Sequence, residues 1–391
     1  MKSLEDVDVE GKNVLLRTDL NMPIEDGEPQ ETVRFQRYLE TIKQLSDRGA
    51  RTVVMAHQGR PARKDFTSLE KHSRILSGEL GRPVRFVQSF FGPELGDGVA
   101  SMDDGDVVML ENVRMLSEEL QNLDPERHSH DFFVERMSRY FDLFVNDAFS
   151  AAHRSHGSMV GFMPLLDTCA GTIMQRELDG CRKVRDTIED PVLVLGGEKP
   201  SDIIGMLEHM IERVDKVLLS GVPGELGLMI EGNDLGKKSA WIEENGFDSD
   251  RDKLEELLDK YGEKIVLPED VRTDSGSYNI EDIPENEMTW DIGPETASSY
   301  TDIIKQADSV LMKGPAGAFD EGHENGTKAL VNALASCDGF TVMGGGHTSS
   351  LVQRFGYEID DFSHVSIAGG AFVRFMSGEN LAAIKALEKY S

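Results

Sequence analysis

The sequence contains few cysteines and no long apolar segment. Its three cysteines, Cys169, Cys181 and Cys337, are an odd number without the spacing of a metal site, which excludes a disulfide framework as the basis of the fold. No apolar run approaches the ~20 residues of a membrane span, and residues Met1–Asp6 lack the apolar core of a secretory signal. We therefore expect a reduced, cytoplasmic protein without a membrane partner.

Basic residues are also scarce. The chain has 41 lysines and arginines against 71 acidic residues, a formal net charge of −30, which argues against nucleic acids and anionic membranes as partners. An ordinary acidic cytosolic enzyme is one interpretation. Adaptation to a salt-rich cytoplasm is the other, favoured because only 18 residues are lysine and the carboxylates are spread over both halves. On that interpretation the protein should lose structure when salt is removed.

Arginine is concentrated at one end of the chain, with eighteen of the 23 arginines within residues 1–185. Several follow apolar runs of strand length, where a forked guanidinium is suited to bind phosphate or carboxylate. A single arginine of this kind is more often part of a surface ion pair, but a converging set predicts a site for a small phosphorylated carboxylate. The arginines at strand ends are Arg17, Arg60, Arg114 and Arg154.

The second half has few arginines but repeated glycine loops after strand-like runs, which typically cradle nucleotide phosphates. The two halves together indicate an enzyme that holds two phosphorylated molecules, one per half. The strand-like runs of the second half are Val192–Leu195, Val217–Leu219, Ile265–Leu267, Val310–Met312 and Phe340–Met343.

Strand-like runs alternate with helical periodicity throughout the 391 residues, which predicts an α/β protein with mainly parallel sheets and two domains. Ligands of such sheets gather at the carboxyl ends of the strands. Residues Ala170–Val184 are predicted to form one helix that connects the domains, although a plain core helix is the alternative. After Arg34 a second helix is predicted, with Gly49 as its C-cap, from the spacing of Phe35, Tyr38, Leu39, Ile42 and Leu45.

Four motifs of the first half carry the candidate ligand-binding groups. In Arg17–Pro23, Arg17 is the expected anchor, and Asp19 and Asn21 offer an acceptor and a donor to a hydroxylated ligand. In Ala56–Pro61, Gly59 permits a tight turn from which Arg60 projects. The other two motifs are Leu110–Arg114 and Asn146–His156.

In this order the motifs resemble those of phosphoglycerate kinase, and the resemblance covers nearly the full length. The matching segments of the second half are Gly196–Asp202, Asp291–Thr296, Lys313–Asp320, Gly326–Ala329, Gly344–Thr348, Ser363–Ser366 and Gly369–Ala371.

The resemblance implies two Rossmann-like domains, each a mainly parallel sheet flanked by helices, and a C-terminal tail that folds back on the N-terminal domain. The implied phosphoglycerate-binding domain comprises 1–168 and 367–391, and the nucleotide-binding domain comprises 186–366. Residues 169–185 would form the interdomain helix.

The implied activity is reversible phosphoryl transfer between ATP and 3-phosphoglycerate, giving ADP and 1,3-bisphosphoglycerate after domain closure. The cofactor would be Mg²⁺ carried with ATP or ADP, and the partners would be these small molecules. By motif match, the substrate-binding residues are Arg17, Asp19, Asn21, Arg34, His57, Arg60, Arg114 and Arg154.

The family match assigns four further sets of residues. The catalytic residues would be Arg34, Lys199, Gly345 and Gly370. The nucleotide-binding residues would be Gly197, Lys199, Gly221, Gly293, Lys313, Pro315, Asp320, Gly344, Gly345, Gly346, His347 and Thr348. The hinge residues would be Glu177, His364 and Ser366, and Asp202 is the candidate metal ligand.

Three residues depart from the family pattern. Ile203 replaces a second lysine, Lys313 replaces an asparagine, and His347 replaces an aspartate that usually binds magnesium. We expect Lys313 to supply the positive charge lost at Ile203. Because a neutral imidazole is a poor ligand for so hard a cation, we expect His347 to contact phosphate instead.

Other functions remain as alternatives. A non-catalytic phosphate- or nucleotide-binding relative of the family is one. A dinucleotide-linked dehydrogenase is another, disfavoured because no Gly-x-Gly-x-x-Gly follows an early strand. We expect a monomer. We expect surface positions for His72, His209 and His323, and no chemistry in the acidic segment Trp241–Lys264.

Overall fold

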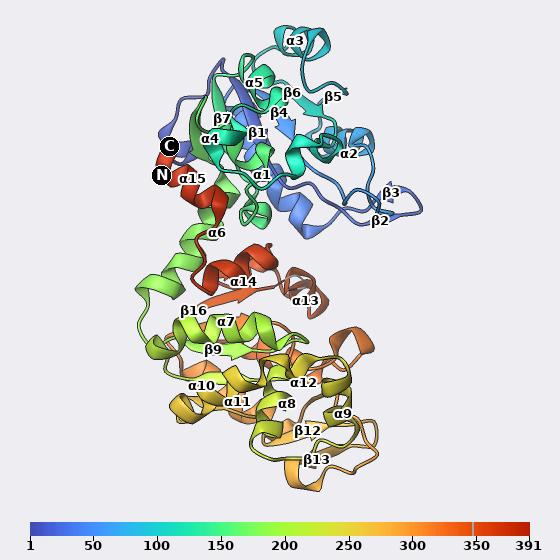
Figure 1. Ribbon diagram of the computed structural model, residues 1–391, viewed down its shortest axis with the longest axis vertical. Coiled ribbons are helices and arrows are strands. Elements are labelled where there is room, and N and C mark those ends of the chain that lie inside the picture. The colour runs from blue at the N-terminus through green and yellow to red at the C-terminus, as the bar shows by residue number, and fades with distance from the viewer. Residues whose placement is uncertain (346–347) are drawn as a thin grey trace. The chain divides into compact units, whose positions relative to one another are not determined.

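The computed structural model describes residues 1–345 and 348–391 and divides the chain into two compact units (Figure 1). Unit 1 comprises Met1–Leu178 and Asn380–Ser391, and unit 2 comprises Asp179–Glu379. Each unit is built on a six-stranded parallel sheet with flanking helices, so the predicted α/β class is confirmed. Among the described residues, no helix combines the length and the apolar character needed to cross a bilayer.

The sheet of unit 1 has the strand order β5-β6-β4-β1-β7-β8, and all its neighbouring strands are parallel. Its central strands are buried on both faces, so they read as continuous apolar runs rather than as alternating patterns. The strands are β1 (Asn13–Arg17), β4 (Arg51–Met55), β5 (Val84–Val87), β6 (Val107–Leu110), β7 (Leu143–Asn146) and β8 (Asp167–Ala170).

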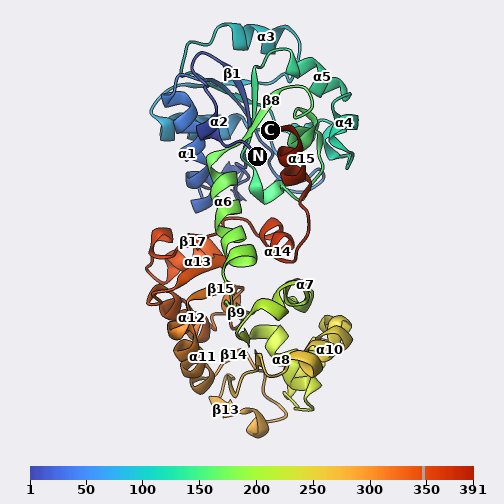
Figure 2. The same ribbon diagram turned by 90° about the vertical axis from the view of Figure 1, so that its left-hand side faces the viewer.

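Helices cover both faces of this sheet (Figure 2). The helix predicted after Arg34 is present as α1, whose N-cap Thr32 accepts a hydrogen bond from the Phe35 amide. Its C-cap is Arg48, and Gly49 follows with a positive φ of 77°. The helices are α1 (Val33–Asp47), α2 (Glu70–Leu80), α3 (Pro93–Ala100), α4 (Pro125–His128), α5 (Phe132–Ser138) and α15 (Ala382–Tyr390).

The chain passes from unit 1 to unit 2 within α6 (Thr172–Arg182). The prediction that this helix begins at Ala170 was wrong, because Ala170 pairs with Asn146 as the last residue of β8. Asp147 closes the turn between strand and helix: its Oδ1 accepts from the amides of Ile173 and Met174 at 2.8 and 2.9 Å. A Cβ on Gly171 would lie 2.3 Å from that carboxylate, so glycine is required there.

The C-terminal helix α15 packs within unit 1. The amide of Ala383 donates to the Ala152 carbonyl at 2.9 Å, and the Lys2 amide donates to Ser391 Oγ at 2.9 Å. These bonds join the two ends of the chain to the same unit.

The sheet of unit 2 has the order β11-β10-β9-β15-β16-β17, again with parallel neighbours throughout. All five strand-like runs predicted for this half are strands of the sheet. The strands are β9 (Val192–Leu195), β10 (Val217–Leu219), β11 (Ile265–Val266), β15 (Ser309–Lys313), β16 (Phe340–Gly344) and β17 (His364–Val365).

Unit 2 also contains a small antiparallel sheet, which the sequence pattern did not predict because its strands have only two or three residues each: β12 (Asp270–Arg272), β13 (Ser277–Asn279) and β14 (Asp291–Ile292). The helices of this unit are α7 (Pro200–Met210), α8 (Gly221–Ile230), α9 (Lys237–Glu244), α10 (Arg251–Tyr261), α11 (Pro294–Gln306), α12 (Asn325–Ala335), α13 (Thr348–Arg354) and α14 (Gly370–Met376).

Candidate functional site

Arg17 lies at the carboxyl end of β1 and is only 2% exposed. Its Nε donates to Ser158 Oγ at 3.0 Å, and its Nη2 lies 3.0 Å from His57 Nδ1. Ser158 is itself held by Glu119, which accepts from the Ser158 amide and hydroxyl at 2.7 Å each. Burial lowers the pKa of Arg17, against the opposing charges of Glu119 and Asp19. The guanidinium is therefore fixed in one orientation by Ser158 and His57, and Ser158 is in turn held by the buried Glu119 carboxylate.

His57 follows β4 and is buried beside Arg17. Burial lowers its pKa to about 3 against the attraction of Asp19, and the charges of Arg17 and Arg154 lower it further. At neutral pH His57 is thus an uncharged hydrogen-bonding group rather than another cation.

Asp19 and Asn21 link the loop after β1 to the loop after β4. Asp19 Oδ1 accepts from the Asn21 amide at 3.0 Å, and Asp19 Oδ2 lies 3.8 Å from Arg34 Nη1. Burial would raise the pKa of Asp19, but the charge of Arg34 and the hydrogen bonds from the Ser150 hydroxyl and the Asn21 amide hold it below its usual value. Asn21 Oδ1 accepts from the Gly59 amide at 2.8 Å, which fixes the second loop against the first.

The predicted tight turn at Gly59 is confirmed: its φ is +62°, and a Cβ there would lie 2.4 Å from the Asp65 carbonyl oxygen. Arg114 is buried and donates through Nη1 to the Gly59 carbonyl. Arg60 projects from the same turn and is exposed, while Arg154 is half-buried beside His153. The structure thus gathers the arginines predicted from strand ends around the loops after β1 and β4.

One histidine of unit 1 lies where the sequence did not place it, and a second approaches a buried carboxylate. His72 was expected at the surface, and this was wrong: it is fully buried, with Nε2 3.0 Å from Gln58 Oε1, because it lies on the inner face of α2 with Leu76. Burial lowers its pKa to about 4. His156 approaches Glu119, with its Nδ1 3.6 Å from Glu119 Oε1.

Three glycine loops of unit 2 are joined through their backbones. The Gly197 amide donates to the Pro315 carbonyl at 2.8 Å, and the Gly221 amide donates to the Ala316 carbonyl at 2.9 Å. Gly314 has a φ of +78°, and a Cβ on it would lie 2.3 Å from the Gly196 carbonyl oxygen. Only glycine allows such close approach, so the loops pack backbone against backbone beside the N-termini of α7 and α8.

Lys313 ends β15 beneath these loops and is only 7% exposed. Its Nζ lies 3.4 Å from Asp202 Oδ2, and a Cβ on Gly197 would lie 3.8 Å from that ammonium. Burial lowers the pKa of Lys313, against the attraction of Asp202, and the nearby charge of Lys199 lowers it further. Ile203 is fully buried in α7, so the position that the family fills with lysine is part of the core here.

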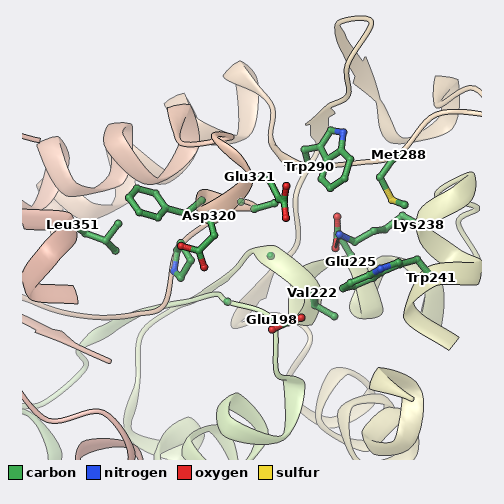
Figure 3. Close-up of a pocket in the computed structure, with 16 residues that line it drawn as sticks. Glu198, Val222, Glu225, Lys238, Trp241, Met288, Trp290, Asp320, Glu321 and Leu351 are labelled. Carbon is green, nitrogen blue, oxygen red and sulfur yellow. Dashed lines mark ion pairs between the residues drawn. The ribbon is translucent and has the colours of Figure 1, made fainter. Parts of the chain in front are cut away.

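A cavity of about 340 Å³ opens beside the loops (Figure 3). Four predicted nucleotide-binding residues line it: Gly197, Gly221, Pro315 and Asp320. Four further lining residues fall within the matched segments Gly196–Asp202 and Lys313–Asp320, although they were not named as binding residues: Glu198, Gly317, Ala318 and Phe319. Sequence reasoning missed the rest of the lining, which comes from several separate elements: Val222, Glu225, Lys238, Trp241, Met288, Trp290, Glu321 and Leu351. Trp241 belongs to the segment Trp241–Lys264, which was expected to carry no chemistry, and its side chain lines the cavity. A usable signal was available, because both tryptophans of the chain lie here.

Two carboxylates, one of them in the matched segment Asp291–Thr296, hold helix N-termini in place. A Cβ on Gly293 would lie 2.1 Å from the Asp270 carboxylate, and that carboxylate accepts from the Thr296 amide of α11 at 2.8 Å. Asp291 accepts from the Gly326 amide of α12 at 2.7 Å, and burial raises its pKa to about 6. Gly293 is outside the described lining of the cavity.

The remaining predicted glycines lie near the ends of β16 and α14. A Cβ on Gly344 would lie 2.1 Å from the Phe372 ring, Gly345 has a φ of +133°, and Gly370 is exposed as the first residue of α14. Thr348 begins α13. Gly346 and His347 lie outside the described residues.

The predicted hinge residues are all buried. Glu177 lies in α6, and His364 in β17 packs so closely that a Cβ on Gly180 would lie 2.4 Å from its ring. The Ser366 amide donates to the Met343 carbonyl at 2.8 Å.

Asp202 can be tested as a magnesium ligand on its surroundings. Its side chain is 44% exposed beside backbone amides suited to phosphate, although one oxygen faces the Lys313 ammonium. Mg²⁺ commonly takes one or two protein carboxylates and completes its shell with phosphate oxygens and water. The residue present therefore fits a metal ion carried by a nucleotide.

A matching family model, similar sequences and a similar solved structure all belong to the same family. The sequence model of the family described as "Phosphoglycerate kinase" matches residues 4–379. The chain is 42% identical to a phosphoglycerate kinase of Halorubrum lacusprofundi over 96% of this chain and 95% of that protein, and 39% identical to one of Haloarcula marismortui over 99% of both. The crystal structure of phosphoglycerate kinase from Pyrococcus horikoshii OT3 superimposes with a TM-score of 0.91 at 33% identity, covering 99% of this chain and 98% of that one.

Proposed function

The chain belongs to the phosphoglycerate kinase family, and from this premise we propose how its residues carry out the reaction of that family. The reaction is the reversible transfer of a phosphoryl group between ATP and 3-phosphoglycerate, giving ADP and 1,3-bisphosphoglycerate. The enzyme is a kinase of glycolysis.

The phosphoglycerate binds to unit 1 at the loops after β1 and β4. Arg17 anchors it, with its guanidinium held by Ser158 and Glu119, and neutral His57 and Asn21 contribute uncharged hydrogen bonds. The positive charge of the remaining arginines neutralises the phosphate and carboxylate of the substrate. These arginines are Arg34, Arg60, Arg114 and Arg154.

The nucleotide binds to unit 2, with its phosphates at the glycine loops and helix N-termini and its base in the cavity. At the phosphates, Lys199 and Lys313 supply the positive charge. Gly345 and Gly370 offer backbone amides close to the transferred phosphoryl group. Asp320 lines the cavity as a hydrogen-bond acceptor for the ribose hydroxyls. Gly221 and Pro315 shape the wall between the two ends.

The chemical step needs no general base, because the attacking group of phosphoglycerate is already an ionised carboxylate. Positioning and charge neutralisation must then provide the rate. We assign that task to Arg34 and to Lys199 with Lys313. Mg²⁺, held by nucleotide oxygens, water and Asp202, would neutralise phosphate charge when bound.

Substrates on separate units require the units to close before transfer, and the hinge is proposed to lie in α6 and the segment Ser363–Gly370. The enzyme is proposed to act as a cytoplasmic monomer in a salt-rich cell. The similarity to haloarchaeal enzymes and the net charge of −30 support the salt-rich setting.

The observation that carries the proposal is the buried, oriented Arg17 among the gathered arginines, because a binding protein for phosphate alone would not need so many guanidinium groups at one site. The test is a coupled assay with ATP and 3-phosphoglycerate, run at 0.1 M and at about 2 M potassium chloride, salt levels at which the Debye length falls from about 10 Å to about 2–3 Å. Formation of ADP that depends on 3-phosphoglycerate is expected. Nucleotide binding without such turnover would favour the non-catalytic alternative.

A further inference from the structure

The cavity of unit 2 has two chemically different ends. Trp241, Met288 and Trp290 gather at one end with Lys238 and Glu225, as Figure 3 shows. Carboxylates outnumber cations in the lining: they are Glu198, Glu225, Asp320 and Glu321, against Lys238. Such a lining repels phosphate, whereas two indole rings and a thioether suit the flat, apolar faces of a nucleobase.

A buried ion pair lies inside this aromatic end. Lys238 Nζ lies 3.3 Å from Glu225 Oε2, and the two residues are 6% and 7% exposed. Thr289 Oγ1 donates to Glu225 Oε1 at 2.5 Å, and Lys238 Nζ donates to the Thr289 carbonyl at 3.3 Å. The ammonium also lies 4.5 Å from the centre of the Trp241 ring. The pair is thus held in place from three sides.

One oxygen of this pair is incompletely satisfied. Among the described residues, no donor makes a hydrogen bond to Glu225 Oε2, although the oxygen is buried and belongs to a residue lining the cavity. Its one near partner is the Lys238 ammonium at 3.3 Å, so the buried carboxylate oxygen keeps acceptor capacity that a ligand can use. The wall of the cavity therefore contains an acceptor, the Glu225 carboxylate, beside a donor, the Lys238 ammonium.

We propose that Glu225 and Lys238 read the edge of the nucleobase and select adenine. The 6-amino group of adenine donates to Glu225 Oε2, and Lys238 Nζ donates to the ring nitrogen beside that amino group. Guanine places a 6-oxo group, an acceptor, opposite the carboxylate at the position where adenine has a donor. This inference rests on the proposed function, because it requires a nucleotide in the cavity.

A purely structural role for the pair is the competing explanation, since Glu225 lies in α8 and Lys238 in α9 and their contact joins the two helices. Changing the protein alone would not separate the two roles. Changing the ligand does: removal of the 6-amino group leaves every helix contact intact and deletes only the bond to Glu225.

The experiment measures binding of ADP, purine riboside 5′-diphosphate and GDP to the whole protein by tryptophan fluorescence. Both tryptophans of the chain line the cavity, so their emission reports its occupancy directly. We expect ADP to bind at least about tenfold more tightly than purine riboside diphosphate, the scale of a hydrogen bond to a charged group. GDP should bind more weakly still, since its oxo group repels the carboxylate.

The matched variant replaces the pair by apolar residues of similar volume, Glu225→Leu together with Lys238→Met, which leaves no buried charge unpaired. It should bind ADP and purine riboside diphosphate equally. The control Lys237→Met removes an exposed lysine next to Lys238 and should keep the preference of the unchanged protein.

The outcomes separate this inference from the function on which it rests. If the unchanged protein turns over but binds ADP and purine riboside diphosphate equally, Glu225 and Lys238 do not recognise the base, and the proposed kinase activity still stands. A preference that survives in the double variant also overturns recognition of the base by this pair. Absence of both ADP binding and turnover would instead overturn the proposed function.

Discussion

At the residue scale, Lys313 is the departure from the family pattern with the clearest physical consequence. Its ammonium is buried beneath the glycine loops and paired with Asp202, close to the backbone of Gly197. Burying a charge is costly unless something compensates it. A phosphate at the loops would provide that compensation, and it would do so most strongly when charge accumulates during transfer.

The prediction is that Lys313→Ala lowers kcat by about a hundredfold or more, the scale of losing one preorganised charge-stabilising donor. The KM for ATP should change far less, because other loop amides still bind the nucleotide. Steady-state kinetics measures both constants. Lys305→Ala, which removes an exposed lysine and the same charge, is the control. A kcat unchanged in Lys313→Ala would refute the role.

The sequence indicated residues whose motif and strand position are both informative. Arg17 was identifiable because it is the last residue of a buried strand, and Gly59 was identifiable because it lies in a tight turn. Glu225 and Lys238 were not, because they lie on two helices and only the packing of α8 against α9 brings them into one cavity. His72 was placed wrongly because its polarity outweighed its position on the inner face of α2.

At the scale of elements, the long buried strands were predictable and the short ones were not. Runs such as Val192–Leu195 are continuous in hydrophobicity because helices cover both faces of the sheet. The start of α6 was misplaced because Cys169 and Ala170 suit a helix as well as a strand, and pairing with β7 decided between them. Local propensity cannot report a partner strand that is distant in sequence.

The joined glycine loops give an element-scale prediction. Gly314→Ala should destabilise unit 2 and weaken nucleotide binding, because its Cβ would meet the Gly196 carbonyl oxygen at 2.3 Å as well as strain a positive φ. Gly232→Ala is the matched control: its φ is +92°, but nothing lies within 4 Å of the added Cβ. Urea unfolding and ADP titration of both variants test this. Equal losses in the two would show that backbone strain alone is responsible.

The strand-to-helix turn at Asp147 gives a prediction about pH. Burial raises the pKa of Asp147 to about 7 from the ordinary 3.8. Between these values the folded protein binds a proton that the unfolded chain does not, so this contribution to stability is complete below about pH 4 and is lost as the pH rises through 7.

Asp147→Asn keeps an amide oxygen to accept from Ile173 and Met174 but cannot ionise. Relative to the unchanged protein, it should therefore gain on the order of 1–3 kcal/mol in free energy of unfolding between pH 5 and pH 8. Urea titrations at constant salt measure this difference. Asp167→Asn, at an exposed position, should show no such trend. A difference for Asp147→Asn that is independent of pH would contradict the assignment.

At the scale of the whole molecule, the net charge of −30 opposes folding, because the compact state brings the carboxylates together. Salt shortens the Debye length from about 10 Å at 0.1 M to about 3 Å at 1 M, which removes most repulsion between exposed charges. The salt-rich interior proposed above would supply this screening.

The expected result is that the thermal unfolding midpoint rises steeply with potassium chloride between about 0.1 and 2 M, and that turnover is lost at the low end together with structure. Circular dichroism and the coupled assay, followed on the same samples, measure both. Sucrose at matched osmolality is the control, since it strengthens apolar burial without screening charge. If sucrose restores the fold as well as salt does, repulsion is not the cause. If the fold persists at 0.1 M salt without either, the acidity is that of an ordinary cytosolic enzyme.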